Sequence, residues 1–127
     1  QEGYLVDLEL RPGEAHCQSG TANLLERAIG YTRRITTNPL LLRLDAGNDS
    51  IDNIRVCHEA ENVEYIIKRN LRKESLDGWL TTAKTLVEAK QLRPGKKAWT
   101  GSLTVERGLD RPLRIVFCVT ERSLSPK

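Results

Sequence analysis

The sequence predicts a mixed α/β chain in two parts. Over residues 1–73, apolar runs typical of strands alternate with helical spacing, which is the pattern of an α/β sheet. Over residues 74–127, one amphipathic helix precedes two alternating runs joined by a short turn, which is typical of an antiparallel hairpin. Apolar residues make up 39% of the 127, enough for a hydrophobic core, and the net charge of +3 permits a polyanionic partner without requiring one.

The first predicted element is a strand over residues 4–10, YLVDLEL, in which apolar and polar residues alternate imperfectly. The letters RPGE at 11–14 predict a turn, because proline presets its own φ and Gly13 accepts the positive φ of a type II turn. The letters LRPG recur at 92–95, where we expect a second, independent turn.

Residues 20–35 have the spacing of an amphipathic helix. Its apolar stripe comprises Leu24, Leu25, Ala28, Ile29 and Ile35. Thr21 is the expected N-cap, since its hydroxyl can accept a backbone N–H of the first turn. The helix should end before Pro39, because a residue that precedes proline avoids the α region.

A buried strand that ends on a carboxylate is predicted next. Residues 40–45, LLLRLD, form a nearly continuous apolar run, which is typical of a parallel strand buried on both faces. A turn of small and polar residues follows, and Ser50 or Asp49 can cap the helix expected over 50–62. The inward side chains of that helix should be Ile51, Ile54 and either Cys57 or His58.

Asp45 is the candidate functional residue of the first part. The next strand, VEYIIKR at 63–69, completes the order strand, helix, strand, helix, strand. In open α/β sheets, ligands bind beyond the carboxyl ends of the strands, so an acid there is aimed at a functional edge. Its oxygens suit a divalent cation such as Mg²⁺. The alternative is an ordinary turn or helix-cap residue, which is common for an aspartate close to a glycine.

The second part opens with a helix over residues 74–90, whose apolar stripe includes Trp79. Two alternating runs, 97–107 and 113–122, are joined by the turn letters GLDRP and predict a hairpin. One face of its second strand should carry Leu113, Ile115, Phe117 and Val119. This helix and hairpin form the predicted second subdomain.

Basic residues follow the third predicted strand. The candidates for DNA contact are Lys68, Arg69, Arg72 and Lys73, with Arg93, Lys96 and Lys97 as weaker candidates around the second turn. Contacts from lysine and arginine to phosphates supply most nonspecific nucleic-acid affinity. The alternative for each is a solvated charged surface. Trp99 also has two interpretations, a core residue of the hairpin or an aromatic that stacks on an unpaired base.

Three further features of the composition concern the cellular compartment and the completeness of the chain. Three widely spaced cysteines, Cys17, Cys57 and Cys118, without a CxxC pair, indicate small buried thiols in a reducing compartment, and we expect a cytoplasmic protein. No apolar run approaches the ~20 residues of a membrane span. The sequence contains no methionine, so we expect that the chain is a piece of a longer protein.

Four segments in order resemble the DDE transposases of bacterial insertion sequences, in the branch with a β-rich insertion: LELRPGEAHCQSGTANLLERAI, LLLRLDAGNDSIDNI, EYIIKRNLRKE and RIVFCVTER. The resemblance implies a ribonuclease-H-like catalytic fold, in which two aspartates and a glutamate bind two Mg²⁺ ions. Such an enzyme hydrolyses DNA at the transposon end and joins the freed 3′ hydroxyl to target DNA. Residues 1–73 would then be a partial catalytic core with strands 3 to 5, and residues 74–127 the β-rich insertion.

The resemblance assigns one catalytic and metal-binding residue, Asp45, as the second aspartate at the end of the fourth strand. The first aspartate and the glutamate of a Tyr-Arg-Glu-Lys signature have no counterparts here, so neither Asp7 nor Glu121 takes those roles. The chain alone is therefore expected to be inactive and to bind Mg²⁺ weakly. Its expected partners are transposon-end and target DNA, with no small-molecule substrate and no membrane.

The resemblance also implies a missing neighbour in the sheet. The parent fold has the strand order 3-2-1-4-5, and this chain has no counterparts of strands 1 and 2. Open apolar edges recruit other strands, so we expect self-association. Two other functions stay open: a noncatalytic nucleic-acid-binding or interaction domain, and a metal-dependent nuclease on the same fold.

Overall fold

The computed structural model describes residues 3–72 and 74–123 and divides the chain into two compact units, Gln1–Asn70 and Leu71–Lys127. The division falls close to the expected boundary between residues 73 and 74. Across the described residues, helices accompany one parallel and one antiparallel sheet, which confirms the predicted mixed α/β class. Each unit contains one of these two sheets.

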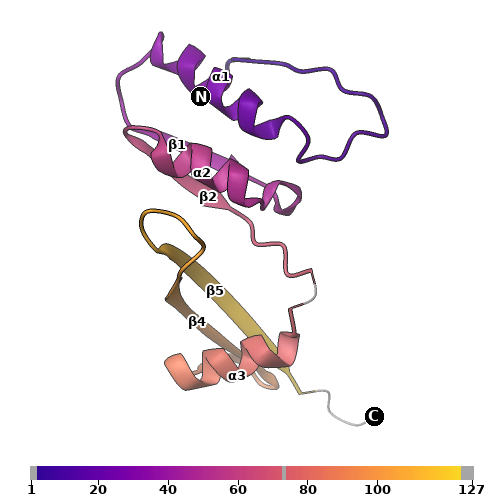
Figure 1. Cartoon of the computed structure of the whole chain (residues 1–127). Coiled ribbons are helices and arrows are strands. Elements are labelled where there is room, and N and C mark those ends of the chain that lie inside the picture. Colours follow the sequence, from indigo (N-terminus) through magenta and orange to yellow (C-terminus); the bar gives the residue numbers. More distant parts are fainter. Residues whose placement is uncertain (1–2, 73, 124–127) are drawn as a thin grey trace. The chain divides into compact units, whose positions relative to one another are not determined.

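The first unit combines two helices with a two-stranded parallel sheet (Figure 1). Its elements are α1 (Thr21–Arg33), β1 (Leu40–Leu44), the 3-10 helix η1 (Ala46–Asn48), α2 (Ile51–Glu59) and β2 (Val63–Ile67). The two strands pair from Leu40 opposite Val63 to Leu44 opposite Ile67. The predicted succession of strand, helix and strand is therefore confirmed, and both strands have their carboxyl ends at one edge of the sheet.

The sheet of the first unit is covered on one face. Helix α2 packs on β2 and contacts α1, and its buried side chains include both Cys57 and His58. The opposite face stays open, with Leu41 59% and Ile66 57% exposed. The expectation that residues 40–45 are buried on both faces is therefore wrong for the described chain, because no described element of this unit covers the second face.

Residues 4–10 are extended but belong to neither sheet, so the prediction of a strand there is wrong for the described chain. The acids of this segment turn towards α1, where Arg27 lies 3.1 Å from Asp7 and 2.9 Å from Glu9. Its apolar side chains stay open, with Leu8 77% and Leu10 98% exposed. A strand needs a neighbour to satisfy its backbone, and none of residues 3–72 supplies one.

Two local predictions near the start of α1 are also corrected. Thr21 is the first helical residue and Gly20 (φ 73°) is the N-cap, while the Thr21 hydroxyl donates to the carbonyl of Cys17 at 2.7 Å. In the preceding turn, the Pro12 carbonyl accepts the closing hydrogen bond at 3.0 Å. Pro12 is therefore the first residue of that turn, and Gly13 does not have a positive φ.

The second unit is a three-stranded antiparallel sheet with one helix across it (Figure 1). Its elements are α3 (Leu76–Leu86), β3 (Lys90–Arg93), β4 (Lys96–Val105) and β5 (Leu113–Arg122), in the sheet order β3-β4-β5. The predicted helix and hairpin are thereby confirmed. The additional strand β3 is joined to β4 by the second predicted turn, in which Gly95 has a φ of 72°.

The core of the second unit lies between α3 and the hairpin. Its most buried side chains are Ala83, Trp99 and Phe117, and partly buried Trp79, Leu80, Val87, Leu103 and Val119 pack around them. Burial alternates along β5, with Leu113, Ile115, Phe117 and Val119 on the covered face as predicted. Gly101 is required here, because a Cβ at that position would lie 2.8 Å from the Phe117 ring.

Candidate metal-binding edge of the first unit

Asp45 stands directly after β1, at the carboxyl edge of the parallel pair. Its backbone is extended (φ −78°, ψ 176°), and its carbonyl accepts the N–H of Asn48 at 3.1 Å as η1 begins. The exposed carboxylate makes no capping bond to the backbone, and its Oδ1 instead accepts the side-chain N–H of Asn48 at 2.8 Å. Asp45 therefore occupies the N-cap position of η1 without a side-chain cap, and its bond to Asn48 within the same turn fits the alternative of an ordinary turn residue.

The turn after Asp45 needs a glycine for steric reasons. A Cβ on Gly47 would lie 3.2 Å from both Asp45 Oδ1 and Cys17 Sγ, which is tighter than an ordinary side-chain contact. The Cys17 thiol donates to the Gly47 carbonyl at 3.1 Å, so the loop before α1 is held against the turn. A larger residue at position 47 would press on the carboxylate, and the glycine keeps the approach to Asp45 clear.

Asn53, on α2, fixes the other side of the turn. This side chain is 1% exposed and donates to the carbonyl of Asn48 at 3.0 Å. The backbone N–H of Asn53 donates to Ser50 Oγ at 3.3 Å, so Ser50 is the N-cap of α2 and Asp49 is not. The role of Asn53 in holding the turn was not predicted from the sequence. The available signal was its position directly before the inward-facing Ile54, which places a polar side chain close to the core.

Asp49 is the second acid near this edge, and its contacts are structural. Its side chain is 7% exposed, and Oδ2 accepts the backbone N–H of Asn70 at 2.9 Å. The same oxygen lies 3.8 Å from Arg69 Nη1. Asp49 therefore holds the segment that follows β2 against the turn that follows β1.

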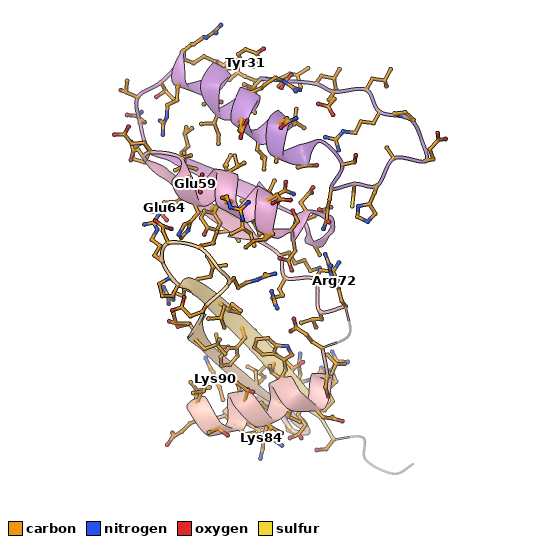
Figure 2. The ribbon with its side chains drawn as sticks, in the orientation of Figure 1. Tyr31, Glu59, Glu64, Arg72, Lys84 and Lys90 are labelled. Atoms are coloured by element: carbon orange, nitrogen blue, oxygen red, sulfur yellow. The ribbon has the colours of Figure 1, made fainter. Side chains whose placement is uncertain are left out.

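The predicted basic residues divide between the two units. Lys68 and Arg69 lie in the first unit, Arg72 lies on the segment that leads to α3 in the second unit (Figure 2), and Lys73 lies outside the described residues. The N–H of Lys68 donates to the carbonyl of Leu44 at 3.1 Å. The structure thus brings exposed Lys68 to the same edge as Asp45, whereas Arg69 has an internal partner in Asp49.

Trp99 lies in the core of the second unit. Its side chain is 5% exposed and packs with Ala83 and Phe117. Lys84 Nζ lies 5.3 Å from the ring centroid and 2.9 Å from Glu121 Oε1, so a paired cation already covers the ring. The burial favours the core interpretation of Trp99, and its contact with an unstacked base stays a prediction.

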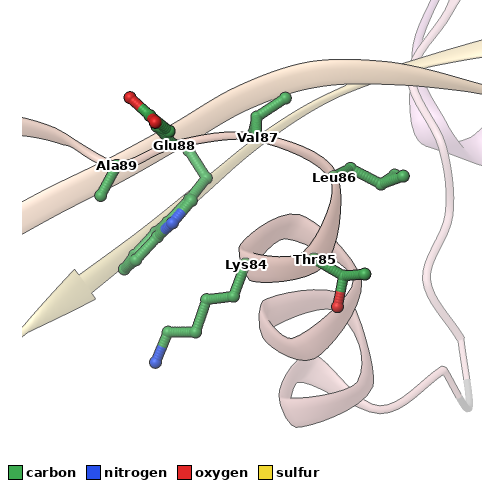
Figure 3. A pocket seen from close by; sticks show the side chains of 7 residues that line it. Lys84, Thr85, Leu86, Val87, Glu88 and Ala89 are labelled. Carbon is green, nitrogen blue, oxygen red and sulfur yellow. The ribbon is translucent and has the colours of Figure 1, made fainter.

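A pocket of about 390 Å³ lies beside the same tryptophan (Figure 3). It is lined by Lys84, Thr85, Leu86, Val87, Glu88, Ala89 and Trp99. Figure 3 shows Lys84 reaching out from α3, while Glu88 and Ala89 lie on the segment that follows the helix. Because Glu88 is the single carboxylate of the lining, the pocket assembles neither a metal site nor a pair of catalytic acids.

Shifted pKa values in the first unit lie away from the carboxyl edge. Hydrogen bonds from Arg27 and then Arg11 lower the pKa of the Glu9 carboxyl. Burial raises the pKa of the Cys57 thiol to about 11. These shifts mark a surface ion-pair cluster and a core thiol rather than an acid–base catalyst.

Within residues 3–72 and 74–123, no three histidine, cysteine, aspartate or glutamate side chains lie close enough together to hold a metal ion. No helix in the described part of the chain combines the length and apolar character needed to cross a bilayer. Comparisons with protein-family models, with curated proteins and with solved structures give no match. The case for a function therefore depends on the geometry of the edge.

Proposed function

We propose that this chain is part of the catalytic domain of a DDE DNA transposase, in which Asp45 supplies one metal-binding carboxylate. The observation that carries the proposal is the placement of Asp45: it follows the carboxyl end of a parallel strand, its exposed side chain makes no capping bond to the backbone, and a Cβ at Gly47 would crowd its carboxylate. Ligands of α/β sheets bind at this edge. The parent enzyme would cleave DNA at the ends of an insertion sequence and join it to a target.

The same proposal includes a ribonuclease-H-like arrangement of the strands. The parallel pairing of β1 with β2 through α2 fits strands 4 and 5 of a ribonuclease-H-like sheet. The segment 4–10 fits strand 3, since its apolar side chains are exposed and it belongs to neither sheet of the described chain. In the proposed parent fold, two further strands lie between this segment and β1.

The described residues do not form a magnesium site by themselves. Mg²⁺ needs several oxygen ligands in near-octahedral geometry, whereas Asp45 offers one carboxylate and Asp49 Oδ2 is engaged by Asn70. The proposal therefore requires acids from elsewhere in a longer protein. This chain contributes a carboxylate whose position is fixed by the Asn48 amide and by the turn that Asn53 locks.

Lys68 is the proposed phosphate contact at this edge. It lies beside the strand end that carries Asp45, and a cation there lowers the repulsion between a DNA phosphate and an exposed carboxylate. Arg72, Lys73 and Trp99 remain proposed DNA contacts further along the chain. Arg69 contributes less in this proposal, because it lies beside Asp49 within the unit.

A noncatalytic nucleic-acid-binding or interaction domain is the second candidate function. The observation that favours it is the lack of a three-ligand cluster within the described ranges, together with the basic net charge of +3. A metal-dependent nuclease would use the same edge and differ from a transposase only in its last step. Hydrolysis would end its reaction, and no strand would be joined.

The substitution Asp45→Asn in the complete reading frame tests the proposal. Asparagine keeps the shape of the side chain but removes the charge that attracts a metal ion, a change worth several kcal/mol in a metal-assisted reaction. We expect cleavage and joining of labelled flanking DNA in Mg²⁺ to fall on the order of 10²-fold or more, with DNA binding nearly unchanged. The matched control is Asp52→Asn, because the Asp52 side chain is 72% exposed on α2 and should leave turnover intact.

The outcomes separate the candidates. Turnover of the Asp45→Asn protein close to that of the unchanged protein would show that Asp45 is only a turn residue. Cleavage without any joined product would identify a nuclease. Mg²⁺-independent DNA binding without cleavage by the unchanged protein would leave the binding domain as the function.

A further inference from the structure

The second unit leaves one face of its sheet open. Helix α3 covers the face that carries Trp99 and Phe117. Directly opposite residues of an antiparallel pair share a face, so the strand register defines the other side. We call this side the open face. Its exposed residues are Thr100, Ser102 and Thr104 of β4, Arg114, Val116, Cys118, Thr120 and Arg122 of β5, and Lys90 and Arg93 of β3; half-buried Lys96 and buried Ala98, 5% exposed, lie on the same side of β4.

The charged residues of the open face are all basic. Its charged residues are Lys90, Arg93, Lys96, Arg114 and Arg122, and its strands place no carboxylate among them. The acid of β5, Glu121, lies on the covered side, where it pairs with Lys84 of α3 at 2.9 Å. No ion pair between described residues engages any cation of the open face, so its positive charge is uncompensated. Figure 2 labels Lys84 on the helix and Lys90 at the start of β3.

Three of these cations form a row across neighbouring strands. Arg93 lies opposite Lys96, and Lys96 lies opposite Arg122. The Cβ atoms of such pairs are about 4.5–5.5 Å apart, and like charges placed there destabilise a sheet. A bound anion would offset this repulsion.

The size of the open face suits an extended polyanion rather than one small anion. The cations Arg114 and Arg122 lie near the two ends of β5 and are roughly 27 Å apart at ~3.4 Å per residue. The hydroxyls of Thr100, Ser102 and Thr104 are exposed between them. Arginine, lysine, serine and threonine are the side chains that make most contacts with DNA phosphates, and arginine binds a phosphate through two parallel N–H groups.

We propose that the open face binds the phosphate backbone of duplex DNA, with Arg93, Lys96 and Arg122 as its anchor. The choice of DNA among polyanions rests on the proposed function of the chain. The positive charge of the open face is an observation that does not depend on that function. The contacts are to phosphates, so binding should be largely independent of base sequence and strongly dependent on salt.

Charge removal on the complete 127-residue chain tests the anchor. The variant R93Q/K96Q/R122Q is compared with R34Q/R55Q/R111Q, which removes the same charge from exposed positions outside the open face and outside the candidate DNA contacts. Binding to a labelled duplex of about 20 base pairs is followed by fluorescence anisotropy between about 50 and 200 mM salt. We expect the first variant to lose about tenfold or more in affinity at low salt, and its log–log salt slope to fall by about 2–3. Equal losses in both variants would overturn the proposal.

A stability measurement guards against a folding artefact. Because the anchor row is repulsive, R93Q/K96Q/R122Q should melt at the same temperature as the unchanged chain or at a higher one. A clearly lower melting temperature would mean that the row stabilises the sheet, which would overturn its assignment as an anion-binding anchor.

Two exposed thiols show, by their protection from alkylation, whether DNA binds at the open face or at the Asp45 edge. Cys118 lies on the open face, and Cys17 contacts the Asp45 turn of the first unit. We expect DNA to slow alkylation of Cys118 several-fold. Protection of Cys17 alone would support the edge of the first unit and overturn the open-face proposal, whereas protection of Cys118 alone would support the open face without the edge. Displacement of DNA by polyglutamate as effectively as by unlabelled DNA would overturn the assignment to nucleic acid.

Discussion

The two units differ in the chemistry of their uncovered sheet faces. In the first unit this face carries Leu41 and Ile66, which are 59% and 57% exposed, beside exposed Arg43 and Glu64, and the segment 4–10 exposes further leucines. In the second unit the open face carries mostly hydroxyls and cations, while Trp99 and Phe117 are buried on the other side. Apolar area in water is unfavourable and hydrated polar area is not. The second unit therefore buries Trp99 and Phe117 between its own helix and sheet. The first unit leaves apolar side chains exposed, and a further layer of structure could cover them.

The difference follows from how each sheet is connected. The second unit pairs β4 and β5 through one turn, and antiparallel sheets commonly keep one face in water. The first unit pairs β1 and β2 in parallel, an arrangement found almost only in larger sheets that are covered on both faces. A parallel sheet of two strands with one uncovered face is smaller than parallel sheets normally are. The first unit thus has the local geometry of a larger sheet.

The largest expected difference between the units is in the loss of stability when one apolar side chain of each is truncated, by Phe117→Ala in the second unit and by Leu41→Ala in the first. Phe117 is 7% exposed in the core of the second unit, so its loss should reduce the free energy of unfolding by about 3–5 kcal/mol. Leu41 is 59% exposed, so its loss should change the same quantity by less than about 1 kcal/mol. Urea denaturation measures both variants.

The chain provides a separate probe for each unit. Both tryptophans, Trp79 and Trp99, lie in the second unit, and the buried thiol Cys57 lies in the first. Tryptophan fluorescence therefore follows the second unit and pulsed alkylation of Cys57 follows the first. A loss for Leu41→Ala as large as that for Phe117→Ala would show that the face around Leu41 is covered and would end the contrast.

The next effect is a loss of stability in alkali that is specific to the first unit. The folded pKa of Cys57 is about 11 against an ordinary value of 9.0, so between these pH values the unfolded chain releases a proton that the folded chain retains. The stabilisation is complete below pH 9 and decreases as the pH rises to about 11, by up to about 2–3 kcal/mol. Denaturation of the unchanged chain and of Cys57→Ala across this range measures the difference.

The matched control for this titration is Cys118→Ala, which removes an exposed thiol from the second unit. It should leave the alkaline loss unchanged, because the Cys118 thiol is in contact with water in the folded chain as it is in the unfolded chain. If Cys57→Ala shows the same alkaline loss as the unchanged chain, another group is responsible and Cys57 is not the source.

Elements that depend on neighbours in sequence were predictable. The α3 helix and the hairpin follow from helical spacing and from alternation along β5, which places Phe117 inward. The short strand β3, KQLR, has no apolar alternation and forms because the Pro-Gly turn with Gly95 folds it back along β4. Residues 4–10 do alternate, but a strand also needs a partner, and alternation contains no information about whether one is present.

The position of the candidate edge was predictable from the sequence, but the contacts that hold it in place were not. The location of Asp45 follows from an apolar run that ends on an acid before a small-residue turn. The roles of Asn53 and Asp49 depend on contacts with Asn48 and Asn70, which come from loops whose positions are set by the folded chain. The anchor row of the second unit depends on strand register, which places Arg93, Lys96 and Arg122 side by side although they are separated in sequence.

The smallest expected effect is weak self-association through the segment 4–10. Leu8 and Leu10 are 77% and 98% exposed on an extended backbone without a sheet partner, and such edges recruit strands from other copies. The double substitution Leu8→Lys and Leu10→Lys should return the sedimentation of the concentrated chain to that of a monomer. Val116→Lys is the matched control, because Val116 is 67% exposed on the open face, where an added charge opposes no apolar contact. A chain that already sediments as a monomer at high concentration would show that the apolar surface of the first unit is not sufficient for association, and that the contrast between the units concerns hydration alone.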